Sequence, residues 1–308
     1  MDETFDVMIL GAGAAGLTAG IYASRAKLST LILNEGAVGG QMVLTNEIAN
    51  YPGVEITQGF ALANIMKKQA KDFGCKIKSN VKIVEYNLEQ DIKSVVLEDG
   101  RSFKAKAVIL APGGKPRPLN LPGEEEFKGK GISYCATCDG EFFTNKKLIV
   151  VGGGNSALEE AVALTNYADK VTIVHQFDHF QAFEHAIQEA KNNPKIDFIM
   201  ESELRGFFGN ENLEKVSIEH LPSGKISEKI INGVFVFVGY IPSTEAFINI
   251  VHLNDRNEFI VDEHMKTNIP GVFAAGDCIA KKYRQVTTAV ADGTIAALSA
   301  TEFIRTSK

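Results

Sequence analysis

The sequence predicts an α/β fold with two related domains, each built around a central, mostly parallel sheet. Two observations support this prediction. Glycine-rich turns begin at Gly11 and Gly152, each directly after a short apolar run and directly before small and apolar residues at helical spacing. With 308 residues, of which 45% are hydrophobic, the chain has room for about two domains of ordinary size.

The first glycine turn lies between an apolar strand and a helix. Val7–Leu10 is the strand, Gly11 to Gly16 is the turn, and Leu17–Ala23 begins the helix. In such a turn the first glycine permits the bend, the second lets the backbone approach a pyrophosphate, and the third lets the helix pack on the strand. The helix N-terminus attracts the anion. The pattern therefore predicts a Rossmann-like dinucleotide site whose contacts include Gly11, Gly13, Ala14, Ala15 and Gly16.

The next strand ends in an acid. Thr30–Asn34 is the strand, and Glu35 follows it directly. A carboxylate at this position accepts hydrogen bonds from an adenosine ribose. The first site therefore suits FAD or NAD.

The second unit repeats this layout without the acid. Lys147–Val151 is the strand, Gly152 to Ala157 the turn, Leu158–Leu164 the helix and Val171–Val174 the next strand. The position that matches Glu35 is Gln176, so the second site lacks the carboxylate that favours an NAD ribose. It also lacks the nearby arginine that accommodates a 2′-phosphate.

Composition narrows the class of protein. The net charge is -6 and no block of like charge occurs, which gives no basis for binding nucleic acid or anionic lipid. No apolar run reaches the roughly 18 residues of a membrane span, and the first residues lack the pattern of a secretory leader. We expect a cytoplasmic protein whose partners are proteins and small molecules.

The four cysteines divide into one functional pair and two structural residues. Cys135 and Cys138 form a Cys-x-x-Cys motif, a spacing that supports a reversible disulfide and, at a helix start, a lowered thiol pKa. Half of a zinc site is the alternative, but no second ligand pair follows at a suitable distance, so we expect no metal. Cys75 is expected in a half-buried strand and Cys278 in a turn.

Several short motifs together resemble the low-molecular-weight thioredoxin reductases, in the same order along nearly the whole chain. They are Gly39-Gly40-Gln41, Asn50-Tyr51-Pro52-Gly53, Leu121-Pro122-Gly123-Glu124, Cys135-Ala136-Thr137-Cys138-Asp139, Gly276-Asp277-Cys278 and Arg284-Gln285. The resemblance implies an FAD enzyme that reduces thioredoxin through the dithiol. It also implies a homodimer.

The resemblance further implies that the second domain is inserted in the first. The sequence shows where the first domain would break: an apolar run ends at Pro112, and another, at 233–239, ends before Pro242. We therefore expect a discontinuous FAD-binding domain at 1–114 and 245–308 and an inserted redox-dithiol domain at 115–244. Near the end of the chain, a strand leads into the turn at Asp277 and a closing helix covers 289–303.

Individual roles also follow from the resemblance. Cys138 would face the flavin, Cys135 would attack the disulfide of the protein substrate, and Asp139 would exchange the proton. Asp139 also suits a helix cap or a turn. The remaining matches lie at the cofactor: Gln41 and Asn50 touch it, Asp277 holds the ribityl chain, Arg284 and Gln285 border the isoalloxazine ring, and Gly40 and Gly276 belong to the matching turns.

The electron donor is where the chain departs from the family. The family's His-Arg-Arg-x-x-x-Arg signature for the NADPH 2′-phosphate is replaced here, with Gln176, Phe177 and Gln181 at the arginine positions. We therefore expect reduced ferredoxin as the donor, with NADPH or NADH as the alternative. A non-enzymatic flavin redox sensor is a further alternative.

Three phenylalanines near these positions allow two interpretations. Phe177, Phe180 and Phe183 recur every three positions. They could form a helix face packed on the core, or they could close a disused nucleotide pocket.

Overall fold

The computed structural model describes residues 3–44, 48, 50–134 and 136–306, without the side chains of residues 44, 137 and 138. It divides into two compact units, residues 1–115 with 242–308 and residues 116–241. Lys115 and residues 242–244 thus belong to the first unit, whereas the sequence boundaries assign them to the second. Where the chain passes between the units, β7 (Gly114–Pro116) pairs with β16 (Tyr240–Pro242).

The first unit contains a seven-stranded sheet in the order β3-β2-β1-β6-β5-β4, with β17 also paired to β6. The pairs among β1, β2, β3, β6 and β17 are parallel, and β4 and β5 join as an antiparallel hairpin. The elements are β1 (Glu3–Leu10), α1 (Ala14–Arg25), β2 (Thr30–Asn34), η1 (Gly40–Leu44), α2 (Gly59–Asp72), β3 (Lys76–Ser79), β4 (Ile83–Asn87), β5 (Lys93–Leu97), β6 (Ser102–Leu110), η3 (Glu245–Phe247), β17 (Val272–Ala274) and α7 (Val286–Thr306).

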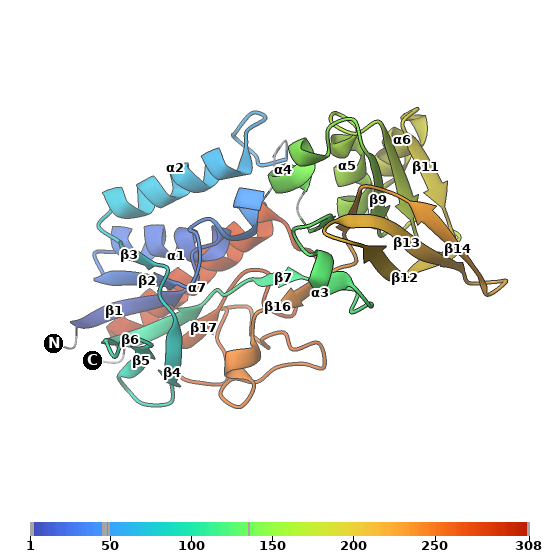
Figure 1. Ribbon diagram of the computed structural model, residues 1–308. Coiled ribbons are helices and arrows are strands. Elements are labelled where there is room, and N and C mark those ends of the chain that lie inside the picture. The colour runs from blue at the N-terminus through green and yellow to red at the C-terminus, as the bar shows by residue number, and fades with distance from the viewer. Residues whose placement is uncertain (1–2, 45–47, 49, 135, 307–308) are drawn as a thin grey trace. The chain divides into compact units, whose positions relative to one another are not determined.

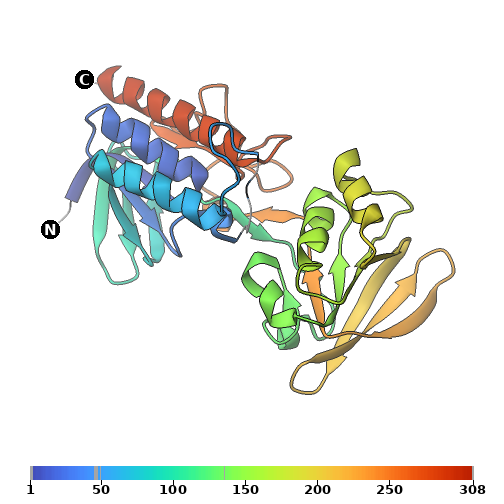
Figure 2. The same cartoon turned by 90° about the horizontal axis from the view of Figure 1, so that it is seen from above.

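Both faces of the sheet are buried along the second half of β1, which explains why Val7–Leu10 is continuously apolar. Val7 and Ile9 pack with α1, α2 and α7 on one face, where the three helices lie side by side (Figures 1 and 2). Met8 and Leu10 point to the other face and pack with Phe259 and neighbouring residues of the C-terminal segment. Because both faces are covered, a ligand can reach this sheet at the carboxyl ends of its strands, which is the usual binding edge of α/β folds.

The second unit is built on a parallel sheet of five strands in the order β11-β10-β9-β15-β8. A separate antiparallel sheet, β12-β13-β14, packs on one of its faces, and α5 and α6 pack on the other (Figure 1). The elements are α3 (Glu124–Phe127), β8 (Ile132–Ser133), α4 (Ala136–Asp139), η2 (Gly140–Phe143), β9 (Lys147–Val151), α5 (Asn155–Leu164), β10 (Lys170–Val174), α6 (Glu184–Asn192), β11 (Ile196–Ile199), β12 (Ser202–Gly209), β13 (Leu213–His220), β14 (Lys225–Ile230) and β15 (Gly233–Val236).

The predicted α/β class with two Rossmann-like sheets is confirmed. Both strand–turn–helix–strand units occur where the glycine turns predict them. The antiparallel sheet of the second unit is not among the predicted elements. It covers the sheet face that a second layer of helices covers in many α/β folds.

Candidate functional site

The first glycine turn joins β1 to α1 at the carboxyl edge of the sheet. Gly11 has a φ of +112°, and a Cβ there would lie 2.0 Å from the carbonyl oxygen of Ala111. A Cβ at Gly16 would lie 2.0 Å from the carbonyl oxygen of Gly11. Beside Gly13 the space is open, because a Cβ would meet nothing closer than Gly40 Cα at 3.8 Å. The open position is the one at which a backbone approaches a pyrophosphate.

Asp277 lies beyond β17 at the same edge. The preceding Gly276 packs so closely on α1 that a Cβ there would lie 2.9 Å from Ala15 Cβ. Asp277 Oδ1 is buried and accepts no hydrogen bond from the described residues, although Lys281 Nζ lies 3.4 Å away. Burial raises the pKa of the Asp277 carboxyl, and the positive charge of Lys281 opposes this rise. Asp277 is therefore a carboxylate with spare acceptor capacity.

Other predicted cofactor residues gather in this unit. Asn50 Nδ2 donates to Gln285 Oε1 at 3.2 Å, which joins residues far apart in the sequence. Gln41 Nε2 donates to a backbone carbonyl of β7 at 3.1 Å. Gly40 faces the first turn, since a Cβ there would lie 2.9 Å from Gly13 Cα.

Two charged candidates differ in their surroundings. Glu35 is exposed directly after β2, as expected for a ribose acceptor. Arg284 forms an ion pair with the buried Glu258, and its Nε donates to the carbonyl oxygen of Asp277 at 3.1 Å. The charge of Arg284 is thus already neutralised by a carboxylate.

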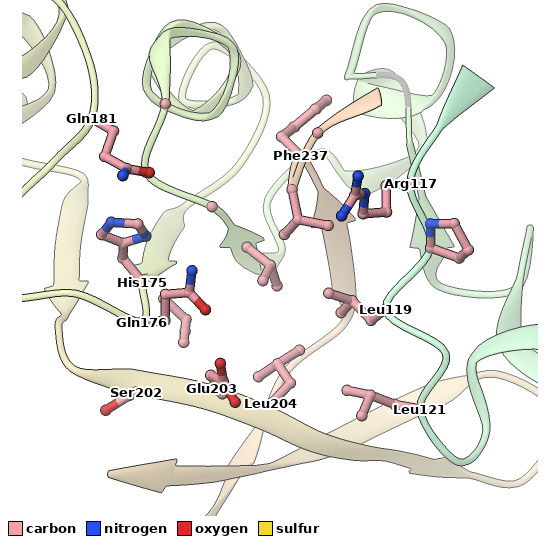
Figure 3. A pocket seen from close by; sticks show the side chains of 18 of the residues that line it. Arg117, Leu119, Leu121, His175, Gln176, Gln181, Ser202, Glu203, Leu204 and Phe237 are labelled. Carbon is pink, nitrogen blue, oxygen red and sulfur yellow. The ribbon is translucent and has the colours of Figure 1, made fainter. Parts of the chain in front are cut away.

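The second glycine turn opens onto a cavity of about 560 Å³ (Figure 3). The cavity lies at the carboxyl ends of the parallel strands, where Val151, Val174 and Phe237 line it. This edge of a parallel sheet is the usual ligand site of α/β folds. A Cβ at Gly152 would lie 2.3 Å from the carbonyl oxygen of Phe237, whereas Gly154 has open space, with Gln181 O nearest at 3.9 Å.

The polar lining of the cavity comes partly from residues that the sequence analysis did not identify. His175, Gln176 and Gln181 follow β10, as expected. The additional polar side chains are Arg117, Ser202, Glu203 and Arg205. The last three belong to β12. The sequence signal of its hairpin with β13 is the alternation of Glu203, Leu204 and Arg205, followed by the turn-forming Asn210-Glu211-Asn212.

His175 is held neutral by its position. Its ring lies over the glycine turn, where a Cβ at Gly153 would come within 2.4 Å of it. Nε2 lies 3.1 Å from the carbonyl oxygen of His179, which can only accept, so Nε2 carries the proton. Burial lowers the pKa of His175. The ring therefore adds no positive charge to the cavity at neutral pH.

The phenylalanines do not close the cavity. Phe177, Phe180 and Phe183 lie in the segment between β10 and α6, so the prediction of a helix face is wrong. None of the three lines the cavity, which contradicts the interpretation of a closed pocket. Phe180 packs against the core and stacks on His175 with ring centres 5.7 Å apart, whereas Phe177 and Phe183 are exposed.

The dithiol lies largely outside the described residues. Cys135 is not among them, and of Cys138 only the backbone is described, in α4. Asp139 ends α4, and its Oδ2 accepts a hydrogen bond of 2.6 Å from the hydroxyl of the buried Ser133.

The other two cysteines are free and buried. Burial raises the pKa of each thiol to about 12. Cys75 lies just before β3 and is almost fully buried, whereas the sequence analysis expects a half-buried strand residue.

The described residues contain no cluster of three or more His, Cys, Asp or Glu side chains that could hold a metal ion. None of their helices is both long and apolar enough to cross a membrane.

Comparison with known proteins identifies the class. The family model described as "Pyridine nucleotide-disulphide oxidoreductase" matches residues 5–293. A thioredoxin reductase from Peptoclostridium acidaminophilum is 44% identical over 311 residues, covering 99% of this chain and 98% of the relative. The chain therefore belongs to the low-molecular-weight thioredoxin reductase family and is a flavoprotein disulfide reductase.

Solved structures agree with this assignment. The Lactococcus lactis thioredoxin reductase is 40% identical with a TM-score of 0.95, over 98% of this chain and 99% of that one. A ferredoxin-flavin thioredoxin reductase from Clostridium acetobutylicum is 29% identical with a TM-score of 0.54, over 99% and 100%. The structures that match this chain thus include a reductase that is named for ferredoxin.

The cofactor of this family is FAD, and the residues of the first unit fit it. Gly13 leaves open space where a pyrophosphate would approach, and Glu35, exposed directly after β2, would accept hydrogen bonds from an adenosine ribose. Asp277 Oδ1 offers the unused acceptor that a hydroxylated ribityl chain needs.

Proposed function

We propose that this protein reduces thioredoxin with electrons from a reduced nicotinamide dinucleotide, which binds in the cavity of the second unit. The observation that supports this donor is the cavity itself. Its glycine turn has open space at Gly154, its volume is about 560 Å³, and none of Phe177, Phe180 and Phe183 lines it. The family description names a pyridine nucleotide as well.

The overall reaction transfers two electrons from the reduced dinucleotide to the disulfide of thioredoxin. A hydride and one proton are consumed, the dinucleotide is oxidised, and one disulfide of thioredoxin becomes two thiols. Bound FAD supplies a two-electron carrier between the nucleotide and the Cys135–Cys138 disulfide.

The protein contributes binding and proton transfer. The turn from Gly11 to Gly16 and the carboxylates of Glu35 and Asp277 hold the cofactor. Cys135 attacks the thioredoxin disulfide while Cys138 exchanges electrons with the flavin. Asp139, oriented by the hydroxyl of Ser133, exchanges the proton that thiol and thiolate interconversion requires.

The donor is tested by anaerobic mixing of the FAD-loaded protein with NADH, NADPH and reduced ferredoxin in separate experiments, with flavin absorbance as the signal. We expect at least one nucleotide to bleach the flavin and to support turnover of thioredoxin. Ferredoxin is the competing donor, favoured by the lack of arginine at 176, 177 and 181. Bleaching by ferredoxin but by neither nucleotide would reject the proposal.

The dithiol is tested with single serine variants. Cys135→Ser should leave a Cys138 thiolate against oxidised flavin, visible as a long-wavelength charge-transfer absorbance, and Cys138→Ser should not. Either change should stop thioredoxin reduction. Turnover by the double variant would reject the dithiol mechanism and leave the sensor alternative open.

The homodimer is a proposal from family resemblance, tested by sedimentation.

A further inference from the structure

We propose that Glu203 makes the cavity of the second unit selective for a dinucleotide whose adenosine ribose carries no 2′-phosphate, so that NADH is the preferred donor over NADPH. This inference rests on the proposed use of a nicotinamide dinucleotide. It assigns to β12 the carboxylate that the end of β10 lacks.

The backbone brings Glu203 to the ribose end of the cavity. The ribose of a bound dinucleotide lies at the end of the strand after the glycine-turn helix, which here is β10 followed by Gln176. Ser202 N donates to the carbonyl oxygen of His175 at 2.9 Å, so β12 begins beside that strand end. Glu203 and Gln176 both line the cavity, and Figure 3 shows the Glu203 carboxylate pointing into it from β12.

The charges around Glu203 leave it net negative. Arg205 Nη1 lies 2.7 Å from Glu203 Oε2, and Arg205 Nε lies 2.5 Å from Glu219 Oε2. Two carboxylates thus share one guanidinium, which leaves one net negative charge. Glu203 Oε1 accepts no hydrogen bond from the described residues, so it is available to a ligand hydroxyl.

The unpaired cation of the cavity lies on its other side. Arg117 has no carboxylate partner among the described residues. Its backbone N–H donates to the carbonyl oxygen of Gly239, which follows β15. In the sheet, β15 and β10 flank β9 on opposite sides, so their ends lie about 10 Å apart. Arg117 therefore serves the pyrophosphate or the nicotinamide half better than the adenosine ribose.

Glu203 and the two glutamines would distinguish NADH from NADPH at the 2′-oxygen of the adenosine ribose. A carboxylate accepts hydrogen bonds from ribose hydroxyls, and the amides of Gln176 and Gln181 can both donate and accept. A 2′-phosphate would instead bring a second anion to Glu203, and on that side of the cavity the described residues offer it no free guanidinium. Like charges at close range cost enough to weaken binding about tenfold or more.

The test measures binding directly, by calorimetric titration of the FAD-loaded protein with NAD⁺ and with NADP⁺, which differ only in the 2′-phosphate. We expect NAD⁺ to bind at least about tenfold more tightly. Glu203→Gln should reduce this ratio about tenfold by weakening NAD⁺ and strengthening NADP⁺. Tighter binding of NADP⁺ by the unmodified protein would overturn the inference.

Glu219→Gln is the matched control, because Glu219 pairs with Arg205 but does not line the cavity. It removes the same charge but leaves the Glu203 acceptor in place, so it should strengthen NADP⁺ binding without weakening NAD⁺ binding. An equal loss of NAD⁺ affinity in the two variants would overturn the assignment of the contact to Glu203. Circular dichroism checks that both variants are folded.

Failure of this inference differs from failure of the proposed function. If neither NAD⁺ nor NADP⁺ binds and neither reduced nucleotide bleaches the flavin, the proposed donor class fails and this inference fails with it. If NADPH bleaches the flavin more efficiently than NADH, the donor class stands and only the selectivity is wrong.

Discussion

The two glycine turns of this protein share one backbone design but differ in the side chains around it. Gly11 and Gly152 both have positive φ, and each is closed to a side chain by a carbonyl oxygen at the end of a neighbouring strand. Gly13 and Gly154 are the open positions in both turns. The backbone thus provides an anion site twice.

The two sites differ first at the residue that follows the second strand of each strand–turn–helix–strand unit. Glu35 follows β2, whereas Gln176 occupies the matching position after β10. The amide N–H of Ala12 is bonded to Asn34 Oδ1 at 2.9 Å, whereas the matching Gly153 lies under the ring of His175. We therefore expect the side chains at the strand ends, and the elements that cover the sheet, to decide which ligand binds at each turn, whereas the glycines determine only the backbone conformation.

The sharpest test of this comparison places valine at the two open positions. Gly13→Val should remove FAD, because the side chain would occupy the path of the pyrophosphate, and purified protein should be colourless. Gly154→Val should keep FAD but weaken the binding of NAD⁺ about a hundredfold or more. Absorbance spectra and calorimetry measure the two losses. Loss of FAD from Gly154→Val would show that the sites are not independent.

A second test uses the helices that follow the turns. α1 contains no acid, whereas α5 carries Glu159 and Glu160 in succession. Burial, and then the charge of Glu159, raise the pKa of Glu160 to about 7. Because this pKa is above the ordinary value of an unfolded chain, Glu160 lowers the free energy of unfolding progressively as pH rises from about 4.5 to about 7.

Glu160→Gln should remove this fall. Its free energy of unfolding should equal that of the unmodified protein near pH 4.5 and exceed it by about 3 kcal/mol above pH 7. Urea denaturation at both pH values measures the difference. A constant difference at all pH values would mean that Glu160 ionises normally in the folded state.

A third test makes the first site resemble the second. Glu35→Gln leaves an amide where the ribose acceptor stood, and FAD affinity should fall by about 1 to 2 kcal/mol. Titration of FAD into stripped protein measures it. Glu89→Gln, at an exposed position outside the site, should leave the affinity unchanged. If Glu35→Gln binds FAD as tightly as Glu89→Gln, the strand-end acid does not contribute.

The smallest effect is expected at the phenylalanines. Phe177→Ala should change NAD⁺ affinity less than about twofold, because Phe177 is exposed and does not line the cavity. Phe180→Ala should instead lower stability, since Phe180 packs on the core. A large gain in nucleotide affinity for Phe177→Ala would restore the interpretation of a closed pocket.

The parts of the fold set by local sequence were predictable. Thr30–Asn34 ends at the predicted residues, and both glycine turns lead into helices as expected, because apolar runs and glycine spacing act over a few residues. Gln176 and Gln181 were placed at the second site for the same reason.

The rest depended on contacts between distant segments. Glu203 and Arg205 reach the cavity only because β12 packs against the sheet face opposite α5. The pairing of Arg284 with Glu258 is likewise tertiary, so the sequence could not show that its charge is used. The ferredoxin expectation followed from the missing arginines and from the missing acid at Gln176, and the sequence could not show that the cavity is open.

The burial of Cys75 and Cys278 has a consequence for oxidative damage. With a thiol pKa of about 12, each carries on the order of one thiolate in a hundred thousand molecules at pH 7, and thiolate is the form that peroxides and alkylating agents attack. A flavoprotein disulfide reductase thus keeps the two cysteines outside its Cys-x-x-Cys motif almost unreactive. Because Cys75 and Cys278 are so rarely thiolates, they do not form wrong disulfides with Cys135 or Cys138, although both remain in the core.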